Sequence, residues 1–377
     1  METIERDLST LLRQSLKPNK AVLLFGARRV GKTVLMQQLI DEFEGKVLLL
    51  NGEDYDAQQL LATKSIANYK QLLSGIELLA IDEAQNIPDI GAKLKLIIDE
   101  VPGIRVIATG SSSFNLRNQT GEPLVGRSYS YYLCQFSQHE LSSVQTPLQT
   151  KQELENRLIY GSYPDVVKLD TTQERVQYLK ELTTSYLLKD ILSFDGIKNA
   201  SKMLELLRCI AYQLGSEVSY DEIAKKIGLS KNTIEKYLDL LSKVFVIYKV
   251  GAYAKNLRKE ISKAGKWYFY DNGIRNAIIN NFSPLALRLD AGSLWENYII
   301  TERVKQNHNF LQNKEFYFWR TYDQQEIDLI EVKNEQVTAF EIKNNEKMPK
   351  CPKAFAQSYP DATYQVVNTA NYLSFIQ

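Results

Sequence analysis

The stretch AVLLFGARRVGKTVLMQQLIDEF, residues 21–43, decides the fold of this chain. Its first five residues are apolar and predict a buried strand, and residues 34–43 have the apolar spacing of a helix. Between them, GARRVGKT (26–33) matches G-x-x-x-x-G-K-[ST], a loop whose backbone N–H groups surround phosphates. We therefore expect a phosphate-binding loop, with the positive end of the following helix adding to the attraction.

Each residue type in this loop has a chemical role. Gly26 and Gly31 let backbone N–H groups wrap the phosphates, Lys32 reaches the β- and γ-phosphates, and the Thr33 hydroxyl holds Mg²⁺. The cofactors predicted here are ATP and Mg²⁺. The expected nucleotide contacts are Gly26, Ala27, Arg28, Arg29, Val30, Gly31, Lys32, Thr33 and Val34.

A second motif, LLAIDEAQ (78–85), is an apolar strand that ends in two acids. We expect Asp82 to support the magnesium ion and Glu83 to polarise the attacking water. The pair follows Lys32 by about fifty residues and stands on the third predicted strand, which is where a partner of the phosphate-binding loop is needed.

Two further features are candidates for the same site. ATGSSS (108–113) ends the next strand with a polar cluster in which Thr109, Ser111 or Ser112 could sense the γ-phosphate, and we favour Ser111. The alternative is a serine-rich turn that caps the following helix. Arg127 is a candidate arginine finger, in cis or from a neighbouring subunit, and the alternative is an ordinary ion-paired arginine.

Strand-like runs at residues 21–25, 46–50, 77–82 and 105–109 alternate with helical segments, which predicts an α/β fold with a parallel sheet covered on both faces. A length of 377 residues suggests several domains. We predict a P-loop ATPase core (1–150), a helical lid (151–199), a winged helix-turn-helix (200–285) and a further α/β domain (290–377).

Composition narrows the functional classes. Three scattered cysteines and an N-terminus without a secretory pattern favour the cytoplasm, and no apolar run is long enough to cross a membrane. With only two histidines, a His-rich zinc site or a Ser-His-Asp triad is improbable. The net charge is only +1, but residues 200–285 carry 14 Lys and Arg against 8 Asp and Glu. A nucleic-acid partner would therefore bind there.

Residues 220–241, YDEIAKKIGLSKNTIEKYLDLL, have the pattern of a helix-turn-helix in which Ser230 caps the second helix. Two strands around a basic loop follow and predict a wing. A winged helix also serves as a rigid spacer, and this alternative stays open. The residues expected to contact DNA are Lys231, Asn232, Lys236, Lys255, Arg258 and Lys259.

Acidic residues gather on the predicted strands near the C-terminus. Asp328 lies in EIDLIEV (326–332), and Glu341 and Lys343 share one face of AFEIK (339–343). Glu296, on the preceding helix, could add a carboxylate. Clustered acids are costly unless a cation neutralises them, so we expect Mg²⁺ or Mn²⁺ bound by Glu296, Asp328 and Glu341.

Over nearly its whole length the sequence resembles the AAA+-like P-loop ATPases of bacteria and archaea that carry a nuclease-like C-terminal module, the ExDL-type ATPases. The resemblance rests on GARRVGKT, LLAIDEAQ, TGSSS, LVGR, YGSYPDVV (160–167), YFYDNGI and SLWEN. It implies a restriction-endonuclease-like PD-(D/E)xK domain with Glu296, Asp328, Glu341 and Lys343 as its nuclease site. Ile327 replaces the proline of that motif.

The sequence therefore predicts an ATP-hydrolysing, DNA-binding protein that couples its nucleotide state to a nuclease-like domain, on branched or broken DNA. The catalytic candidates are Lys32, Glu83, Arg127, Asp328, Glu341 and Lys343. A homo-oligomer is compatible with this prediction. The alternative is an ATP-gated switch that recruits a protein partner and whose nuclease-like module is inactive.

Overall fold

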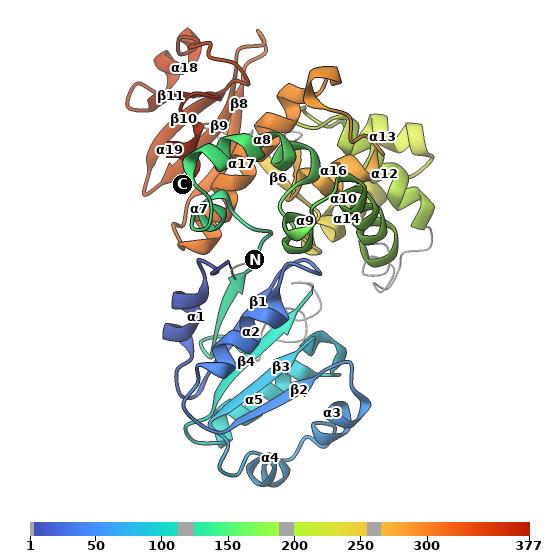
Figure 1. Cartoon of the computed structure of the whole chain (residues 1–377), viewed down its shortest axis with the longest axis vertical. Helices are drawn as coiled ribbons and strands as arrows, with labels where there is room; N and C mark the ends of the chain where they lie inside the picture. Colours follow the sequence, from blue (N-terminus) through green and yellow to red (C-terminus); the bar gives the residue numbers. More distant parts are fainter. Residues whose placement is uncertain (1–3, 112–123, 188–199, 255–264) are drawn as a thin grey trace. The chain divides into compact units, whose positions relative to one another are not determined.

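The computed structural model describes residues 4–111, 124–187, 200–254 and 265–377, and the chain divides into two compact units. The N-terminal unit consists of Glu5–Cys134 with Lys243–Phe245. The C-terminal unit consists of Met1–Ile4, Gln135–Ser242 and Val246–Gln377. In Figure 1 the N-terminal unit is mainly blue and cyan, and the C-terminal unit runs from green to red.

A five-stranded sheet forms the centre of the N-terminal unit. Its strands stand in the order β2-β3-β4-β1-β5, and all neighbours are parallel. This confirms the predicted parallel sheet, although β5 was not among the predicted strands. The strands are β1 (Lys20–Phe25), β2 (Val47–Asn51), β3 (Leu78–Asp82), β4 (Arg105–Gly110) and β5 (Ser128–Tyr132).

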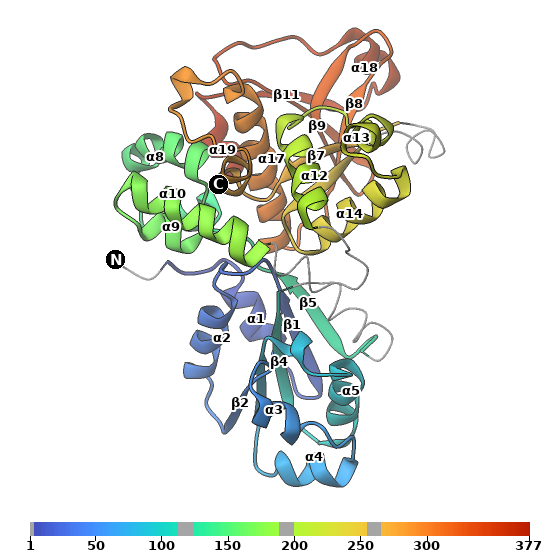
Figure 2. The ribbon, with the colours of Figure 1, turned by 90° about the vertical axis from the view of Figure 1, so that its right-hand side faces the viewer.

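Helices cover both faces of this sheet, and Figure 2 shows α1 and α2 on one side and α5 on the other. The central strands β1, β3 and β4 are rich in Leu, Ile, Val and Ala because both of their faces are buried. In β3, for example, all four apolar residues are fully buried. The helices are α1 (Ser9–Ser15), α2 (Lys32–Asp41), α3 (Tyr55–Leu60), α4 (Ile66–Leu72), the 3₁₀ turn η1 (Ala84–Asn86) and α5 (Ile90–Glu100).

The C-terminal unit has a six-stranded sheet in the order β11-β10-β9-β8-β6-β7. The pairs β6–β7, β8–β9 and β9–β10 are antiparallel, whereas β6–β8 and β10–β11 are parallel. All six strands lie where the sequence predicts strands, including the runs EFYFWR (315–320) and TYQVV (363–367). They are β6 (Ile247–Ala252), β7 (Lys266–Phe269), β8 (Glu315–Arg320), β9 (Glu326–Lys333), β10 (Gln336–Ile342) and β11 (Thr363–Val367).

Helices make up the rest of this unit, beginning with the segment that we predicted as a lid. Within the described ranges, no helix combines the length and the apolar character that crossing a membrane requires. The helices are α7 (Gln138–Ser142), α8 (Pro147–Tyr160), α9 (Pro164–Lys168), α10 (Thr172–Glu181), the π-helical η2 (Leu182–Leu187), α12 (Ala200–Tyr212), α13 (Tyr220–Ile227), α14 (Lys231–Lys243), α16 (Asn272–Ile278), η3 (Leu285–Leu287), α17 (Ala291–Asn309), α18 (Lys353–Ser358) and α19 (Tyr372–Ile376).

Helices α13 and α14 stand where the sequence predicted a helix-turn-helix. The hydroxyl of Ser230 accepts a hydrogen bond from the backbone N–H of Thr233 (3.1 Å), which is the cap that we expected at the start of α14. The inward-facing residues of α14 are buried, and these are Ile234, Tyr237, Leu238, Leu240 and Leu241. The antiparallel strands β6 and β7 follow in the position of a wing.

The two wing strands belong to the same sheet as the C-terminal strands. β6 pairs with β8 through Gly251 opposite Tyr317 and Ala252 opposite Phe318. The boundary that we predicted between residues 285 and 290 therefore does not separate two sheets. Both segments lie in one compact unit.

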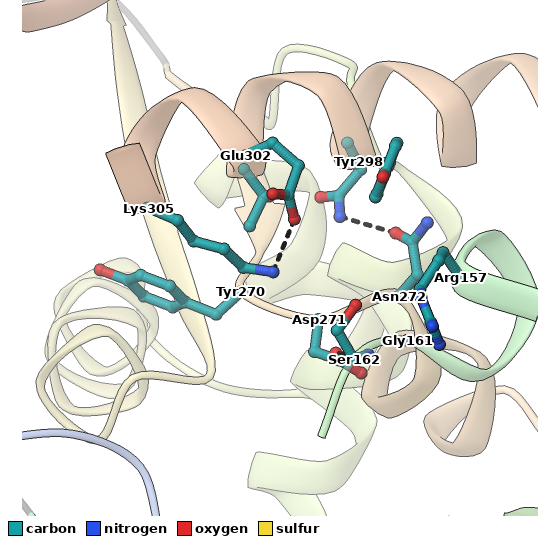
Figure 3. A pocket seen from close by; sticks show the side chains of 11 residues that line it. Arg157, Gly161, Ser162, Tyr270, Asp271, Asn272, Tyr298, Glu302 and Lys305 are labelled. Carbon is teal, nitrogen blue, oxygen red and sulfur yellow. Dashed lines mark hydrogen bonds and ion pairs between the residues drawn. The ribbon is translucent and has the colours of Figure 1, made fainter. Parts of the chain in front are cut away.

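A buried carboxylate, Asp271, joins the turn after α8 to the start of α16. Its Oδ2 accepts from the backbone N–H of Ser162 (2.7 Å), and its Oδ1 accepts from the backbone N–H of Ile274 (3.2 Å). A Cβ atom at Gly161 would come within 2.0 Å of this carboxylate, so the close approach requires glycine. Figure 3 shows these residues around a small polar cavity. The YGSYP and DNG motifs thus meet at one structural contact.

We predict a pH-dependent stability from Asp271. Burial raises the pKa of this carboxyl to about 6, although backbone N–H donors act in the opposite direction. The folded protein therefore holds the proton more tightly than the unfolded chain, so the stabilisation is present below about pH 4 and is lost as the pH rises through 6. The difference in unfolding free energy between wild type and Asp271→Asn should fall by about 3 kcal/mol across this range. Urea unfolding at several pH values measures it, and a constant difference would contradict the prediction.

Candidate functional site

The loop between β1 and α2 stands at the carboxyl edge of the N-terminal sheet. A Cβ atom at Gly26 would lie 2.3 Å from the backbone oxygen of Leu133, so the loop and the chain after β5 can approach this closely only with glycine at position 26. Among the other predicted contacts, Ala27 and Val30 are buried, while Thr33 and Val34 are exposed. Val30 can therefore offer a ligand only its backbone. Arg28 is half-buried and Arg29 is exposed.

Lys32 is buried within this loop. Its Nζ donates to the backbone oxygens of Gly26 (3.0 Å) and Ala27 (2.9 Å). Both partners are neutral carbonyls of the loop itself, and hydrogen bonds between charged groups are stronger than bonds to neutral ones. The ammonium therefore lies beside the first two residues of the loop. A hydrogen bond to a charged phosphate oxygen would be stronger than the bonds to these carbonyls.

Arg6 is a functional candidate that the sequence did not reveal. Its guanidinium donates to the backbone oxygens of Val30 (2.8 Å) and Cys134 (2.6 Å), and only 6% of the residue is exposed. Arg6 thus links the phosphate-binding loop, through Val30, to the chain that follows β5, through Cys134. An arginine in the N-terminal segment carries no motif, so only the folded structure assigns it to the loop.

Asp82, at the end of β3, contacts the start of α2 and the end of β4. Its Oδ2 accepts from the hydroxyl of Thr33 (2.8 Å), and its Oδ1 accepts from the hydroxyl of Thr109. Thr109 in turn accepts from the backbone N–H of Glu83 (3.1 Å). The structure therefore brings together Lys32, Thr33, Asp82 and Glu83, which the sequence assigned to one site.

Glu83 is held by a neighbour that the sequence analysis did not consider. Its Oε2 accepts from Nε2 of Gln85 (2.5 Å), and the same amide nitrogen lies 3.2 Å from the hydroxyl of Ser111. The other amide atom, Oε1 of Gln85, is buried without a hydrogen-bond partner in the described structure. Ser111 is thereby linked to Glu83 through Gln85. Ser112 lies outside the described residues.

The oxygen donors of this site fit a magnesium ion with a nucleotide. The Thr33 hydroxyl and the Asp82 carboxylate are adjacent hard donors, which Mg²⁺ prefers, and Lys32 supplies a positive charge close by. The unpartnered Oε1 of Gln85 leaves an acceptor for a bound group. Thr33 and Asp82 are the residues that would hold the metal.

Arg127 is not brought to this site within the chain. It immediately precedes β5, whose first residue, Ser128, pairs with Ala21 at the beginning of β1. The phosphate-binding loop follows the other end of β1, so a strand length separates the two. Arg127 instead pairs with Asp99 (2.6 Å). An arginine finger from this position could act only on a neighbouring subunit.

The carboxylates near the C-terminus form a separate cluster in the C-terminal unit. Lys343 lies 2.5 Å from Oε1 of Glu341 and 3.7 Å from Oδ2 of Asp328. Oδ2 of Asp328 also accepts from the backbone N–H of Ile342 (2.7 Å). Oε2 of Glu341 is buried without a hydrogen-bond partner in the described structure. The structure thus brings together Asp328, Glu341 and Lys343.

Glu296 approaches the same cluster from α17, but its partners are on β7. Its Oε1 accepts from the hydroxyl of Tyr268 (2.6 Å) and lies 3.6 Å from Nζ of Lys266. Lys266 is only 2% exposed and also pairs with Glu326 of β9. The sequence analysis missed Lys266, because it treated β7 as part of a wing rather than as a neighbour of these acids.

Burial and mutual repulsion shift the protonation of this cluster. Burial raises the pKa of Glu296 to about 7, against the attraction of Lys266, and the charge of Asp328 raises it further. The pKa values of Asp328 and Glu341 are also raised, first by burial. Within the described part of the chain, no group of three or more His, Cys, Asp or Glu side chains is arranged to hold a metal ion. The positive charges beside these acids in the described structure are Lys266, Lys343 and Arg320, which lies 3.8 Å from Glu326.

The predicted DNA contacts on α14 are exposed, but one of them forms an ion pair with an acidic residue. Lys231 pairs with Asp221 of α13 (2.9 Å), while Asn232 and Lys236 are exposed. The remaining predicted contacts, Lys255, Arg258 and Lys259, lie outside the described residues.

Residues 18–142 match a family model described as "AAA domain". The N-terminal unit thus contains an AAA-type P-loop domain, which agrees with the predicted ATPase core. Residues 151–285 match a "Domain of unknown function (DUF8612)", and residues 291–376 match a "Domain of unknown function (DUF4143)". The match over 151–285 spans both the predicted lid (151–199) and the predicted winged helix (200–285), and these domain boundaries stay predictions.

Similar proteins occur in bacteria and archaea, and those compared below are described as uncharacterized proteins. An uncharacterized protein of Mycobacterium tuberculosis is 26% identical over 343 residues, which cover 90% of this chain and 73% of the relative. An uncharacterized protein of Haemophilus influenzae is 24% identical and covers 86% and 83% of the two chains. One from Methanocaldococcus jannaschii is 23% identical and covers 97% and 84%.

Solved structures align only weakly. The RuvB Holliday junction branch migration motor of Thermotoga maritima has a TM-score of 0.31 and 17% identity, over 64% of this chain and 86% of that chain. A Pif1 helicase from Bacteroides, in complex with ADP-AlF3 and ssDNA, has a TM-score of 0.27 and 16% identity, over 49% and 51%. TM-scores of this size establish no shared activity.

We predict that Gly26→Ala disrupts the phosphate-binding loop. The new Cβ would meet a backbone oxygen at 2.3 Å, so the loop must shift. Overpacking of this kind costs about 1–3 kcal/mol, and we expect nucleotide affinity to fall at least about tenfold in a fluorescent-ATP titration. Gly292→Ala is the control, because its φ is ordinary and the nearest atom to the new Cβ, Nδ2 of Asn344, lies at 3.8 Å. Equal affinities for Gly26→Ala and wild type would show that the loop does not bind the nucleotide.

Proposed function

We propose that this protein hydrolyses ATP at the site formed by the β1–α2 loop and the end of β3. The observation that carries the proposal is the hydrogen bond from Thr33 to Asp82 (2.8 Å), beside the buried ammonium of Lys32. It places a cation, a metal-binding hydroxyl and an acidic strand end at one edge of a parallel sheet. The match of residues 18–142 to an AAA domain supports the same activity.

Each residue of the site has a separate role in the proposed hydrolysis. Lys32 exchanges its loop carbonyls for phosphate oxygens, and Thr33 and Asp82 hold the magnesium ion. Mg²⁺, when bound, neutralises charge on the phosphates. Glu83 orients the attacking water and accepts its proton, which contributes about 10²–10⁴ in rate. Gln85 keeps the Glu83 carboxylate in place until then, because its amide donates to Oε2.

We predict that Glu83→Gln separates binding from hydrolysis. Glutamine keeps the shape of the side chain but cannot accept the proton of the water, so ATP turnover should fall about 10²–10⁴-fold while ATP affinity stays near that of wild type. Phosphate release measures the first and a fluorescent-ATP titration the second. Lys32→Ala should lose affinity as well. Glu100→Gln, at a half-buried acid of α5 that pairs with Lys70, is the control and should change neither.

For the C-terminal unit we propose DNA binding coupled to the nucleotide state, with a nuclease-like site at Asp328, Glu341 and Lys343. The element order α17-β8-β9-β10-α18-β11 supports this proposal, as does the convergence of the three side chains. The buried, unpartnered Oε2 of Glu341 leaves a position for Mg²⁺ or Mn²⁺. Coupling requires that ATP and DNA change each other's affinity by the same factor.

The alternative is an ATP-gated switch that recruits a protein partner. It is favoured by the internal pairing of the acids, because Lys266 pairs with Glu296 and Glu326, and Lys343 pairs with Glu341 and Asp328. Acids that are already partly compensated by lysines have less need of a metal ion. In this version the C-terminal unit serves as an interaction surface.

A cleavage assay with Mg²⁺ or Mn²⁺ separates the two proposals. For a nuclease we expect wild type and Glu83→Gln, assayed without ATP, to cleave linear or branched DNA equally, and Asp328→Asn and Lys343→Ala to lose at least about 10² in rate. Asp323→Asn, at an exposed acid of the same unit, is the control and should cleave normally. Absence of cleavage and of DNA binding by wild type would establish the switch instead.

A further inference from the structure

Arg157, on α8, is a buried cation whose charge is not balanced by a contact. Only 5% of the residue is exposed, and its Nε has no hydrogen-bond partner in the described structure. No described carboxylate forms an ion pair with its guanidinium. Burial lowers the pKa of Arg157, and Arg175 lowers it further, whereas Tyr298, Glu153 and Glu302 act in the opposite direction. Fully buried arginines are rare unless they are paired, so this side chain requires an explanation.

Other buried arginines of the same unit are fully engaged. Arg288 pairs with Asp290 (2.8 Å) and also donates to Asn276 (2.9 Å) and to the backbone oxygen of Asn281 (2.7 Å). This unit can therefore neutralise a buried guanidinium where stability requires it. The absence of such partners around Arg157 is a local feature and not a general property of the unit.

Arg157 lines two cavities. The polar cavity of Figure 3, beside Asp271 and Lys305, has a volume of about 10 Å³, which holds about one water molecule. The other is a cleft of about 370 Å³ among α7, α8, α9 and α10. Cavities that hold small molecules measure about 300–1,000 Å³. Only the cleft is therefore large enough for a ligand that would pair with Arg157.

The lining of the cleft specifies the chemistry of that ligand. One wall is aliphatic, and its residues are Ile4, Leu141, Val144, Val167 and Leu169. The polar part contains the guanidinium groups of Arg157 and Arg175 and the side-chain amides of three glutamines. Two acids, Glu153 and Asp170, complete the lining and would repel a ligand of high negative charge. A singly charged anion with an aliphatic body fits this combination.

We propose that the cleft binds a small organic carboxylate with a short aliphatic body, and that its carboxylate pairs with Arg157. The planar guanidinium matches a carboxylate in a bidentate arrangement, and the aliphatic wall receives the rest of the ligand. Inorganic phosphate carries more charge and has no apolar part, so it fits neither wall. The site is separate from the ATPase site and does not depend on it.

Isothermal titration calorimetry with the full-length protein tests this proposal. The probes are 4-methylpentanoate, leucine and inorganic phosphate. We expect 4-methylpentanoate or leucine to bind with a Kd below about 1 mM, and Arg157→Met to weaken binding at least about tenfold. Tighter binding of leucine would support a free amino acid as the ligand, with its ammonium at Glu153 or Asp170. The proposal is overturned if neither carboxylate binds, if phosphate binds more tightly, or if Arg157→Met binds as wild type does.

Thermal unfolding distinguishes a ligand-binding arginine from a structural one. Replacing an unpaired buried charge with an apolar side chain of similar length is neutral or stabilising, so Arg157→Met should unfold at the temperature of wild type or above it. Arg288→Met is the matched control. It removes an arginine with three partners and should lower the unfolding temperature by several degrees. If both variants are destabilised alike, Arg157 is structural and the proposal is overturned.

Discussion

The hydrogen bond between Thr33 and Asp82 is the constraint on which the nucleotide site depends. It joins the first residues of α2 to the end of β3, two elements that are far apart in sequence and meet only because all neighbouring strands are parallel. Thr109, from β4, which lies between β3 and β1 in the sheet, donates a hydrogen bond to the other oxygen of the same carboxylate. One aspartate therefore sets the position of the Thr33 hydroxyl, the strand end and the backbone of Glu83.

The C-terminal unit is organised by buried charge rather than by a parallel-strand edge. Asp271 joins two turns through backbone N–H donors, Glu302 and Lys305 pair with each other at 2.7 Å, and Lys266 pairs with two glutamates. Buried charges are expensive unless they are compensated, so these contacts fix which segments meet. Arg157 departs from this pattern, and its cleft is the place where the unit can accept a charge from outside.

Local patterns predicted much of the fold. Apolar runs located every strand except β5, whose sequence SYSYY lacks an aliphatic run, and the Ser230 cap could be predicted from residue type and spacing alone. Lys32, Thr33, Asp82 and Glu83 could be assigned because their motif has a fixed spacing. Arg6, Gln85 and Lys266 could not, since each acts through a residue that is distant in sequence or through a contact that no motif describes. The distance of Arg127 from the phosphate-binding loop could not be predicted either. It depends on the register of β5 against β1, which places Arg127 at the end of β5 away from the loop.

The position of Lys266 on β7 gives the C-terminal sheet a mechanical property. The side chain comes from the outermost strand, yet its ammonium pairs with two acids that belong to α17 and β9. Displacing β7 by a few ångströms would remove this ammonium from both acids, and Arg320 would remain beside Glu326 (3.8 Å) but not beside Glu296. A proton or a metal cation would then have to take the place of the ammonium. A movement of the edge strand would therefore change which cation the buried acids bind.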